Sequence, residues 1–202
     1  MDTQSSPCSY EEHAAFLKET AHLDFNHPMF SQALNEVVTD DMSLAQKLEE
    51  LFYFTRDVIP FASDASLTAS EALRKRKALC YTKAMIYVSF CRRLGVPARL
   101  VGMKFKILAD LPDAREHYHG AAKLFYNGWW RSIDTVSNRD AWFGWWLKDR
   151  DAGFEPPAFT LERDTVVDSA YVAGLTFEDY ATNDVPQAWL DHMRKFIDTG
   201  HW

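Results

Sequence analysis

The chain is poor in cysteine and lacks the sequence features of a secreted or membrane-spanning protein. Its three cysteines, Cys8, Cys80 and Cys91, show no paired spacing, which argues against a disulfide framework and favours a reducing compartment. The first residues contain neither a basic nor an apolar region, so they do not predict a signal peptide. No run approaches the roughly eighteen uncharged apolar residues that a membrane helix needs. These absences predict a cytoplasmic protein that does not act in a membrane.

Basic charge is scarce as well. The 22 lysines and arginines are outnumbered by 29 aspartates and glutamates, which gives a net charge of −7. The longest basic run, Arg74–Lys77, is best explained as a solvated connection. A chain with this charge is not expected to bind nucleic acid.

Length and composition predict one domain. The 202 residues are 47% hydrophobic and 14% aromatic, which is enough to fill a sizeable core. The sequence shows no internal repeat, no low-complexity tract and no domain boundary. We therefore expect a single domain over residues 1–202, with a helical N-terminal extension (1–62), a core (66–136) and an aromatic-rich C-terminal part (140–202).

The first third of the chain is typical of helices. Ser9 and Ser43 are each followed three positions later by Glu or Gln, which is the pattern of a capping box at a helix N-terminus. These boxes predict helices over residues 10–23 and 44–58, and Pro60 ends the second. A shorter helix follows, for which Thr68 or Ser70 provides the cap.

Residues 80–94 predict the central helix of the domain. The segment is apolar on nearly every face, as expected of a buried helix. Gly95 just past its end is a C-cap signal, and Pro97 stops the helix.

Beyond this helix the apolar period changes from 3.6 to 2. The segments 98–107, 118–126 and 129–134 are typical of strands, and Asn127-Gly128 between the last two is a strong hairpin signal. A final helix is expected over residues 187–198. Helices, a mostly antiparallel sheet and a helical tail together predict an α+β fold.

Cys80 is the first candidate for chemistry. It stands at the start of the central helix, where unpaired backbone N–H groups and a partial positive charge favour a thiolate and can face an oxyanion. The alternative is a small buried hydrophobe, which is the common state of a free cysteine. Cys91, on the apolar stripe of the same helix, is expected to play that packing role.

The hairpin relates His119 to Asp134. With a two-residue turn, Tyr126 faces Trp129 and the register places His119 and Asp134 as diagonal neighbours on one face. Their backbones would lie about 7–8 Å apart, within reach of their side chains. A carboxylate there can hold the imidazole tautomer while the other ring nitrogen turns to a thiol.

His117 lies on the same face, one step further from Asp134. An H-x-H pattern on a strand can also bind a metal, with Cys80 or Asp134 completing the ligand set. No CxxC motif or second histidine pair supports that alternative. We therefore expect no metal and no cofactor, and a partly exposed His117 near a loop.

These residues also carry a family resemblance. The segments concerned are Thr68–Leu73, Cys80-x-x-x-Ala84 leading into Leu94–Gly102, then His119, and Asn127-Gly128-x-Trp130-x-x-x-Asp134. Over about residues 66–136 the chain resembles the transglutaminase-like superfamily, a circularly rearranged relative of the papain fold. The resemblance implies a triad in which Cys80 is the nucleophile, His119 the general base and acid, and Asp134 the residue that orients the histidine.

Three departures from the family pattern concern the surroundings of this triad. Ala78 stands where glycine is frequent, Gly120-Ala121 replaces the usual aromatic residue after the histidine, and Thr135 replaces the proline after the acid. They affect the loop before the nucleophile and the pocket wall. They therefore bear on the class of substrate more than on the three catalytic groups.

The sequence thus predicts a cysteine-dependent acyl-transfer enzyme. Cys80 would attack the carbonyl of a peptide, protein or small amide substrate and form a thioester, which water or an amine then releases. The alternative is a binding or scaffold protein that keeps the fold without turnover. The tryptophan-rich segment after Asp134 either fills a core or lines a substrate groove.

Overall fold

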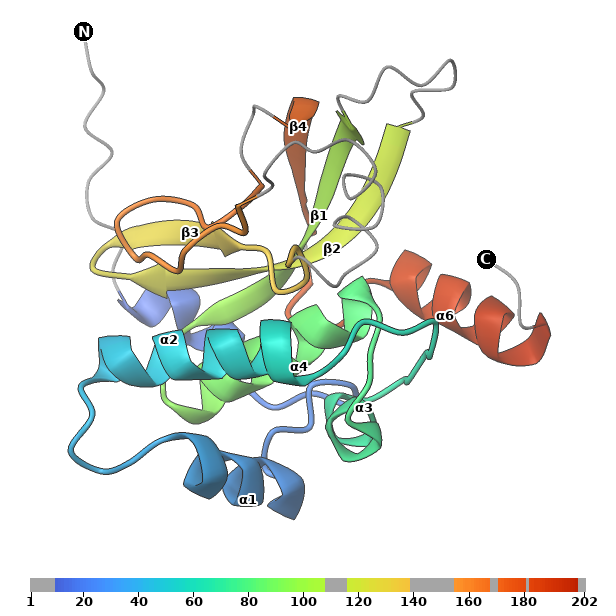
Figure 1. The fold of residues 1–202 in the computed structure, drawn as a ribbon. Coiled ribbons are helices and arrows are strands. Elements are labelled where there is room, and N and C mark those ends of the chain that lie inside the picture. The colour runs from blue at the N-terminus through green and yellow to red at the C-terminus, as the bar shows by residue number, and fades with distance from the viewer. Residues whose placement is uncertain (1–9, 108–115, 139–154, 168–170, 181, 200–202) are drawn as a thin grey trace, which may run out of the picture.

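The computed structural model describes residues 10–107, 116–138, 155–167, 171–180 and 182–199. Its four strands are β1 (Ala98–Ile107), β2 (Glu116–Tyr126), β3 (Trp129–Ile133) and β4 (Val172–Asp179). They form one antiparallel sheet in the order β3-β2-β1-β4 (Figure 1).

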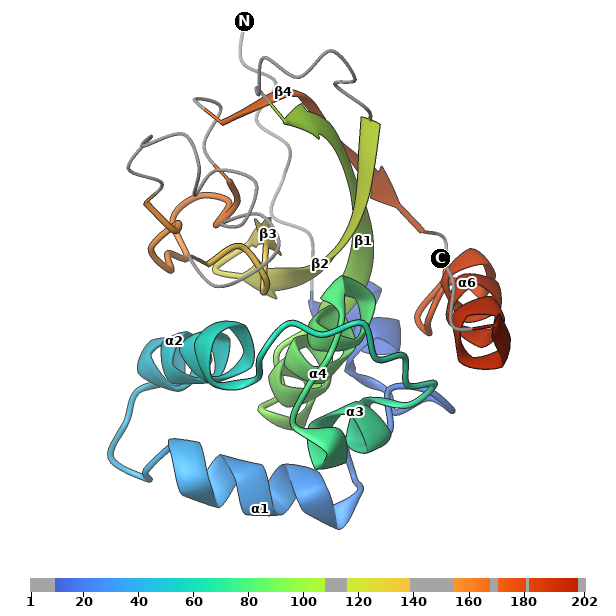
Figure 2. The same ribbon diagram turned by 45° about the vertical axis from the view of Figure 1, so that its right-hand side comes forward.

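The helices gather mainly on one side of this sheet (Figures 1 and 2). They are the 3₁₀ helix η1 (Tyr10–Leu17), α1 (Pro28–Val37), α2 (Leu44–Tyr53), the π-helical turn η2 (Phe54–Val58), α3 (Ala69–Lys75), α4 (Cys80–Arg93) and α6 (Gln187–Thr199). The helix α4 packs on β2 and β1, with α2 and α3 against it, and α6 stands apart at the side of the sheet (Figure 2). The predicted α+β class is confirmed.

The helix α4 is the buried centre of the fold, as its sequence predicts. Most of its side chains are removed from solvent, including that of Cys91. It ends at Arg93, one residue short of the predicted end, and Gly95 adopts the left-handed φ of +77° that favours glycine after a helix. The helix thereby fixes the place of its first residue, Cys80, relative to β2.

The hairpin between β2 and β3 has the predicted register. Asn127 and Gly128 both have positive φ, 48° and 85°, as the two central residues of a type I′ turn require. Tyr126 pairs with Trp129, and the ladder continues to the pair Ala122 and Ile133. The strand β3 then ends immediately before Asp134.

Two helix predictions were wrong in part. The predicted helix 10–23 is instead a 3₁₀ helix that ends at Leu17. The predicted helix 44–58 begins at its capping box as expected, but its last five residues widen into the π-helical turn η2. There the Ile59 N–H donates to the Phe54 carbonyl, five residues back, and such turns occur frequently at functional sites. The sequence reasoning also did not identify α1.

The strand β4 was missed because its pattern is that of an exposed edge strand. Only Val172 is buried, Gly174 interrupts the segment with a φ of +65°, and its pairing with β1 shifts register between Lys104 and Lys106. Alternation is weak under these conditions. The predicted groove or core residues Trp142, Trp145 and Trp146 lie outside the described residues. Among those that are described, no helix is long and apolar enough to span a membrane.

Candidate active site

Cys80 is the first residue of α4 and borders a cavity of about 350 Å³. Its thiol is free and its side chain half-buried. The preceding segment is held by a short parallel bridge in which the Ala78 N–H donates to the Pro60 carbonyl at 3.1 Å and the Ala62 N–H donates to the Ala78 carbonyl at 3.0 Å. The alanine in place of the expected glycine is thus fixed by its backbone, and it directs the chain into α4.

At the start of α4, where the Cys80 thiol lies, the first backbone N–H groups have no acceptor within the helix. The first hydrogen bond of the helix runs from the Lys83 N–H to the Leu79 carbonyl at 2.8 Å. The N–H groups before Lys83 therefore precede the hydrogen-bond ladder, as at any helix N-terminus. The Cys80 N–H is among them, and it is the backbone donor closest to the sulfur along the chain. It can face the negative oxygen that forms when a thiolate attacks a carbonyl.

His119 and Asp134 form a buried pair. The Nε2 atom of His119 lies 2.8 Å from Oδ1 of Asp134, and the two residues are 3% and 0% exposed. Because a carboxylate only accepts hydrogen bonds, Nε2 is the donor. Asp134 also accepts from the Val136 N–H at 2.9 Å and from the Ser137 hydroxyl. The carboxylate is therefore held in one orientation, and it holds the imidazole in turn.

The second ring nitrogen of His119, Nδ1, is not bonded to Asp134. This Nδ1 atom is buried and has no nitrogen or oxygen partner within the described part of the chain. His119 and Cys80 line the same cavity, and the sulfur lies close enough to favour a protonated ring. Buried polar atoms without partners are uncommon and call for an explanation. Here the open position of Nδ1 is the one that a proton from the Cys80 thiol would occupy.

Electrostatics favour a charged His119–Asp134 pair. Burial lowers the pKa of His119, but the Asp134 carboxylate and the Cys80 sulfur raise it by more, so the pKa lies well above its ordinary value. Burial raises the pKa of Asp134, and the neighbouring imidazole lowers it by more, so that pKa lies below its ordinary value. Opposite charges in contact inside the protein account for both directions.

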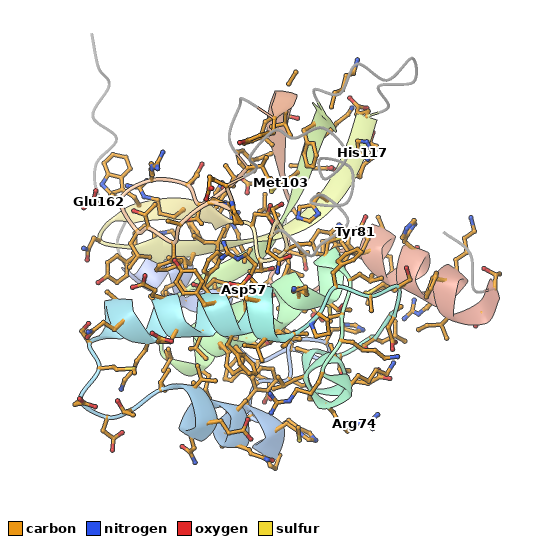
Figure 3. The ribbon with its side chains drawn as sticks, viewed as in Figure 1. Asp57, Arg74, Tyr81, Met103, His117 and Glu162 are labelled. Carbon is orange, nitrogen blue, oxygen red and sulfur yellow. The ribbon has the colours of Figure 1, made fainter. Side chains whose placement is uncertain are left out.

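His117 lies two residues before His119, near the start of β2 (Figure 3). Its ring stacks on Phe105 at 6.1 Å, and burial lowers its pKa. Phe105 also contacts the edge of His119 at 6.2 Å. In the described part of the chain, no three residues of the types that bind metals are grouped as a metal site. His117 is thus partly exposed beside the cavity, as the sequence predicts.

Lys83 is a functional candidate that the sequence reasoning missed. It is 0% exposed, and its Nζ donates to the carbonyls of Arg56 and Ile59, both at 2.8 Å. Burial lowers the pKa of Lys83 to about 8, against the opposing effect of the charges of Asp57, Asp134 and Cys80. Three residues after Cys80, it shares a face of α4 with the thiol. A lysine within an otherwise apolar helix was the signal available.

The η2 turn connects Lys83 to the segment that follows Asp134. Its Arg56 carbonyl also accepts from Nδ2 of Asn138 at 2.9 Å, and the same Nδ2 lies 3.0 Å from Oδ1 of Asp57. The widened helical turn thus presents one carbonyl to both side chains. The loop carrying Asp134 and the helix carrying Cys80 are thereby fastened to one another.

The missing aromatic residue after His119 is replaced from elsewhere in the chain. A Cβ atom at Gly120 would lie 2.4 Å from Cδ1 of Tyr81 and 3.0 Å from the Trp189 ring. Tyr81 and Trp189 stack at 4.4 Å, and the Trp189 Nε1–H donates to the Tyr180 hydroxyl at 2.9 Å. Tyr81 lies between the start of α4 and α6 (Figure 3). An aromatic wall built from α4 and α6 therefore stands beside His119.

The fold resembles that of a solved structure. The structure is similar to one from Cytophaga hutchinsonii that carries a provisional assignment as a cysteine protease, with a TM-score of 0.50 and 15% sequence identity. The similarity covers 61% of this chain but only 42% of the Cytophaga chain, and at this identity it shows the fold alone. No curated protein matches the sequence.

A family model describes the sequence itself. The model of the transglutaminase-like superfamily matches residues 31–135, more than half of the chain. The match includes α4 with Cys80, His119 on β2, and Asp134. The chain belongs to the transglutaminase-like superfamily.

Proposed function

We propose that this protein is a cysteine-dependent acyl-transfer enzyme. Cys80 is the nucleophile, His119 the general base and acid, and Asp134 the residue that orients His119. The observation that carries the proposal is the difference in surroundings between the two ring nitrogens of His119. Nε2 is hydrogen-bonded to Asp134 at 2.8 Å, whereas the buried Nδ1 has no nitrogen or oxygen partner among the described residues, and His119 and Cys80 line the same cavity.

The first half of the reaction forms a thioester. The Cys80 proton passes to Nδ1 of His119, and the thiolate attacks the substrate carbonyl carbon. The carbonyl oxygen takes the electron pair and faces the Cys80 N–H. The carbon–nitrogen bond then breaks, and the imidazolium gives its proton to the departing amine. Asp134 remains ionised throughout and stabilises the imidazolium.

The second half releases the acyl group. Water or an amine attacks the thioester carbonyl while His119 accepts its proton, and the sulfur departs as the carbon–sulfur bond breaks. The proton returns to the thiolate. The product is a carboxylic acid when water attacks and a new amide when an amine attacks. Both outcomes share every step up to the thioester, so the proposal covers peptidase, amidase and transamidase activity.

Capture of the thioester tests this proposal. The protein is mixed with p-nitrophenyl acetate, quenched in acid at intervals and digested with trypsin, which excises Cys80 in the short peptide Ala78–Lys83. The expected result is an acetyl group on this peptide that neutral hydroxylamine removes, as thioesters require. It should be absent in Cys80→Ser and retained in Cys91→Ser. A peptide that never carries a hydroxylamine-sensitive acetyl group would point to a binding protein without turnover.

A further inference from the structure

We propose that the acyl group held beside Cys80 is uncharged and apolar or aromatic, and that Tyr81, supported from behind by Trp189, selects it. This inference rests on the proposed function, because it concerns the substrate of the same site. It adds a substrate class and assigns a role to α6, which lies outside the residues matched by the family model.

The first step is the composition of the cavity that contains Cys80. Apart from the Cys80–His119 pair and Ser63, its lining residues are aromatic, aliphatic or imidazole side chains: Phe61, Leu79, Tyr81, His117, Tyr118 and His192. No Asp, Glu, Lys or Arg lines it in the described part of the chain. Such walls favour the transfer of apolar groups from water.

The two additional histidines do not supply a charge near neutral pH. Burial lowers the pKa of His117 and that of His192, and Lys195 lowers the latter further. These shifts favour the neutral form of both rings near pH 7. Apart from the reacting Cys80–His119 pair, a carboxylate or an ammonium of a substrate would lose its hydration in this cavity without gaining a counter-ion among the described lining residues. The cavity thus discriminates against charged acyl groups.

A second cavity of about 340 Å³ adjoins the first across His119 and Tyr81. It contains His119 but not Cys80, and its lining includes Lys104 and Glu178. The chemistry distinguishes the two cavities. The acyl carbon must reach the sulfur, whereas the departing amine must reach the imidazolium that protonates it. The neutral cavity therefore holds the acyl side, and the cavity with charged residues holds the leaving group.

The wall between the cavities explains how selection arises. Gly120 allows Tyr81 to lie close over β2, and Trp189 of α6 covers the outer face of Tyr81 at 4.4 Å. Tyr118, 63% exposed, stands at the rim of both cavities. Aromatic faces at these distances stack on a planar or aliphatic side chain. An apolar side chain next to the scissile carbonyl would contact Tyr81 and Tyr118, which line the Cys80 cavity. Trp189 lines the second cavity and supports Tyr81 from behind.

The test uses peptide ketones that alkylate a thiolate. Four N-acetyl dipeptide acyloxymethyl ketones, with Phe, Leu, Asp or Lys next to the ketone, are offered to the full chain. A carbon–sulfur bond to Cys80 forms as the carboxylate leaves. Each labelling rate is divided by the rate of iodoacetamide on the same variant, which corrects for intrinsic thiol reactivity. We expect the Phe and Leu reagents to label Cys80 at least about tenfold faster than the Asp and Lys reagents.

Substitutions test whether these aromatic side chains cause the preference for apolar reagents. Trp189→Leu and Tyr118→Ala should each reduce the relative rate of the Phe reagent by about threefold to tenfold. Tyr118 is exposed and lines the Cys80 cavity together with Tyr81, so its variant tests the aromatic lining even if Trp189→Leu fails to fold. Ile197→Ala, on the exposed part of α6, is the matched control and should leave the ratio unchanged.

The outcomes separate this inference from the proposed function. Rapid labelling of Cys80 by iodoacetamide with equal rates for all four ketones, or with Asp or Lys preferred, would overturn the substrate class and leave the nucleophile intact. The same holds if the Phe preference persists in both wall variants. A Cys80 that no reagent labels faster than an ordinary thiol would overturn the proposed function, and the inference with it.

Discussion

His119 and Asp134 meet through Nε2 and Oδ1 at 2.8 Å, and neither side chain contacts solvent appreciably. The contact fixes which nitrogen of His119 faces the acid, and so which nitrogen faces the cavity that holds Cys80. It also fastens the end of β3 to the middle of β2. The same pair therefore has a measurable part in stability and, as we propose, in chemistry.

Removing the carboxylate should destabilise the fold. Asp134→Ala leaves the buried imidazole of His119 without the carboxylate that stabilises its charged form, and breaking a buried ion pair in this way costs about 3–5 kcal/mol. The free energy of unfolding in urea measures the effect. Glu162→Ala is the control, because Glu162 is exposed, and it should change stability by less than about 0.5 kcal/mol. Equal effects of the two substitutions would contradict a buried ion pair.

The pair should also give stability a defined pH dependence. The raised pKa of His119 means that its contribution is complete below the unfolded value of about 6.5 and is lost as the pH rises through the folded value. The lowered pKa of Asp134 means that its contribution is present above about 3.9 and is lost as the pH falls through the folded value.

Unfolding free energies of the wild type and His119→Gln, compared from pH 4 to pH 10, measure this dependence. The wild type should exceed the variant most between about pH 4 and 6.5, and the difference should shrink steadily at higher pH. A difference that grows as the pH rises would mean that His119 is neutral in the folded protein.

The positive charge of Lys83 should increase the rate at which Cys80 is alkylated. Lys83→Met removes a buried cation from the face of α4 that carries Cys80, and such a charge stabilises a neighbouring thiolate. We expect the rate of Cys80 alkylation at pH 6 to fall by at least about tenfold, since neighbouring unit charges at an effective dielectric constant of 20 interact by more than the roughly 1.4 kcal/mol that a tenfold change requires.

Arg92→Met is the matched control for this prediction. Arg92 is a second buried cation of α4, and it too donates to carbonyls, those of Ala98, Lys18 and Asn183. It lies three turns away from Cys80, so its loss should lower stability without changing the alkylation rate. If both variants slow the reaction equally, the role of Lys83 is to hold the fold alone.

Gly120→Ala tests the close approach of Tyr81 to the sheet. The new Cβ would lie 2.4 Å from the Tyr81 ring and 3.0 Å from its Cα, so the helix itself must move, at a cost of about 1–3 kcal/mol. Gly102, the cross-strand partner of Gly120, provides the comparison. Its Cβ would lie 2.6 Å from the Tyr180 hydroxyl, which is the far end of a side chain, and 3.4 Å from Cβ of Glu178, so no backbone has to move. Urea unfolding should show a smaller loss for Gly102→Ala, and the reverse order would contradict the aromatic wall.

The features that local patterns encode were predicted from the sequence. Asn127-Gly128 sets the parity of the hairpin, and this alone relates His119 to Asp134 across the two strands. The apolar run after Cys80 identifies the buried helix, and Ser43 with Gln46 marks where α2 begins. Each of these signals lies within a few residues of the structure that it determines.

The missed features depend on contacts between distant segments. Lys83 is buried because η2, more than twenty residues earlier, turns two carbonyls toward it. The wall beside His119 requires Trp189, which is seventy residues from His119 along the chain. The strand β4 forms because β1 offers it an edge, although its own alternation is weak. The lysine within the apolar helix was a local signal for Lys83, but no local pattern identifies the distant segments that make these contacts.

The alkylation rate of Cys80 as a function of pH tests the central claim most directly. Iodoacetamide labelling is followed on the peptide Ala78–Lys83, with buried Cys91 as the internal reference. If Cys80 and His119 form a thiolate–imidazolium pair, the rate at pH 6 should already approach that at pH 8, and His119→Ala should abolish this plateau. A rate that rises about tenfold per pH unit toward the ordinary thiol value of about 8.5, identically in the wild type and His119→Ala, would contradict the account.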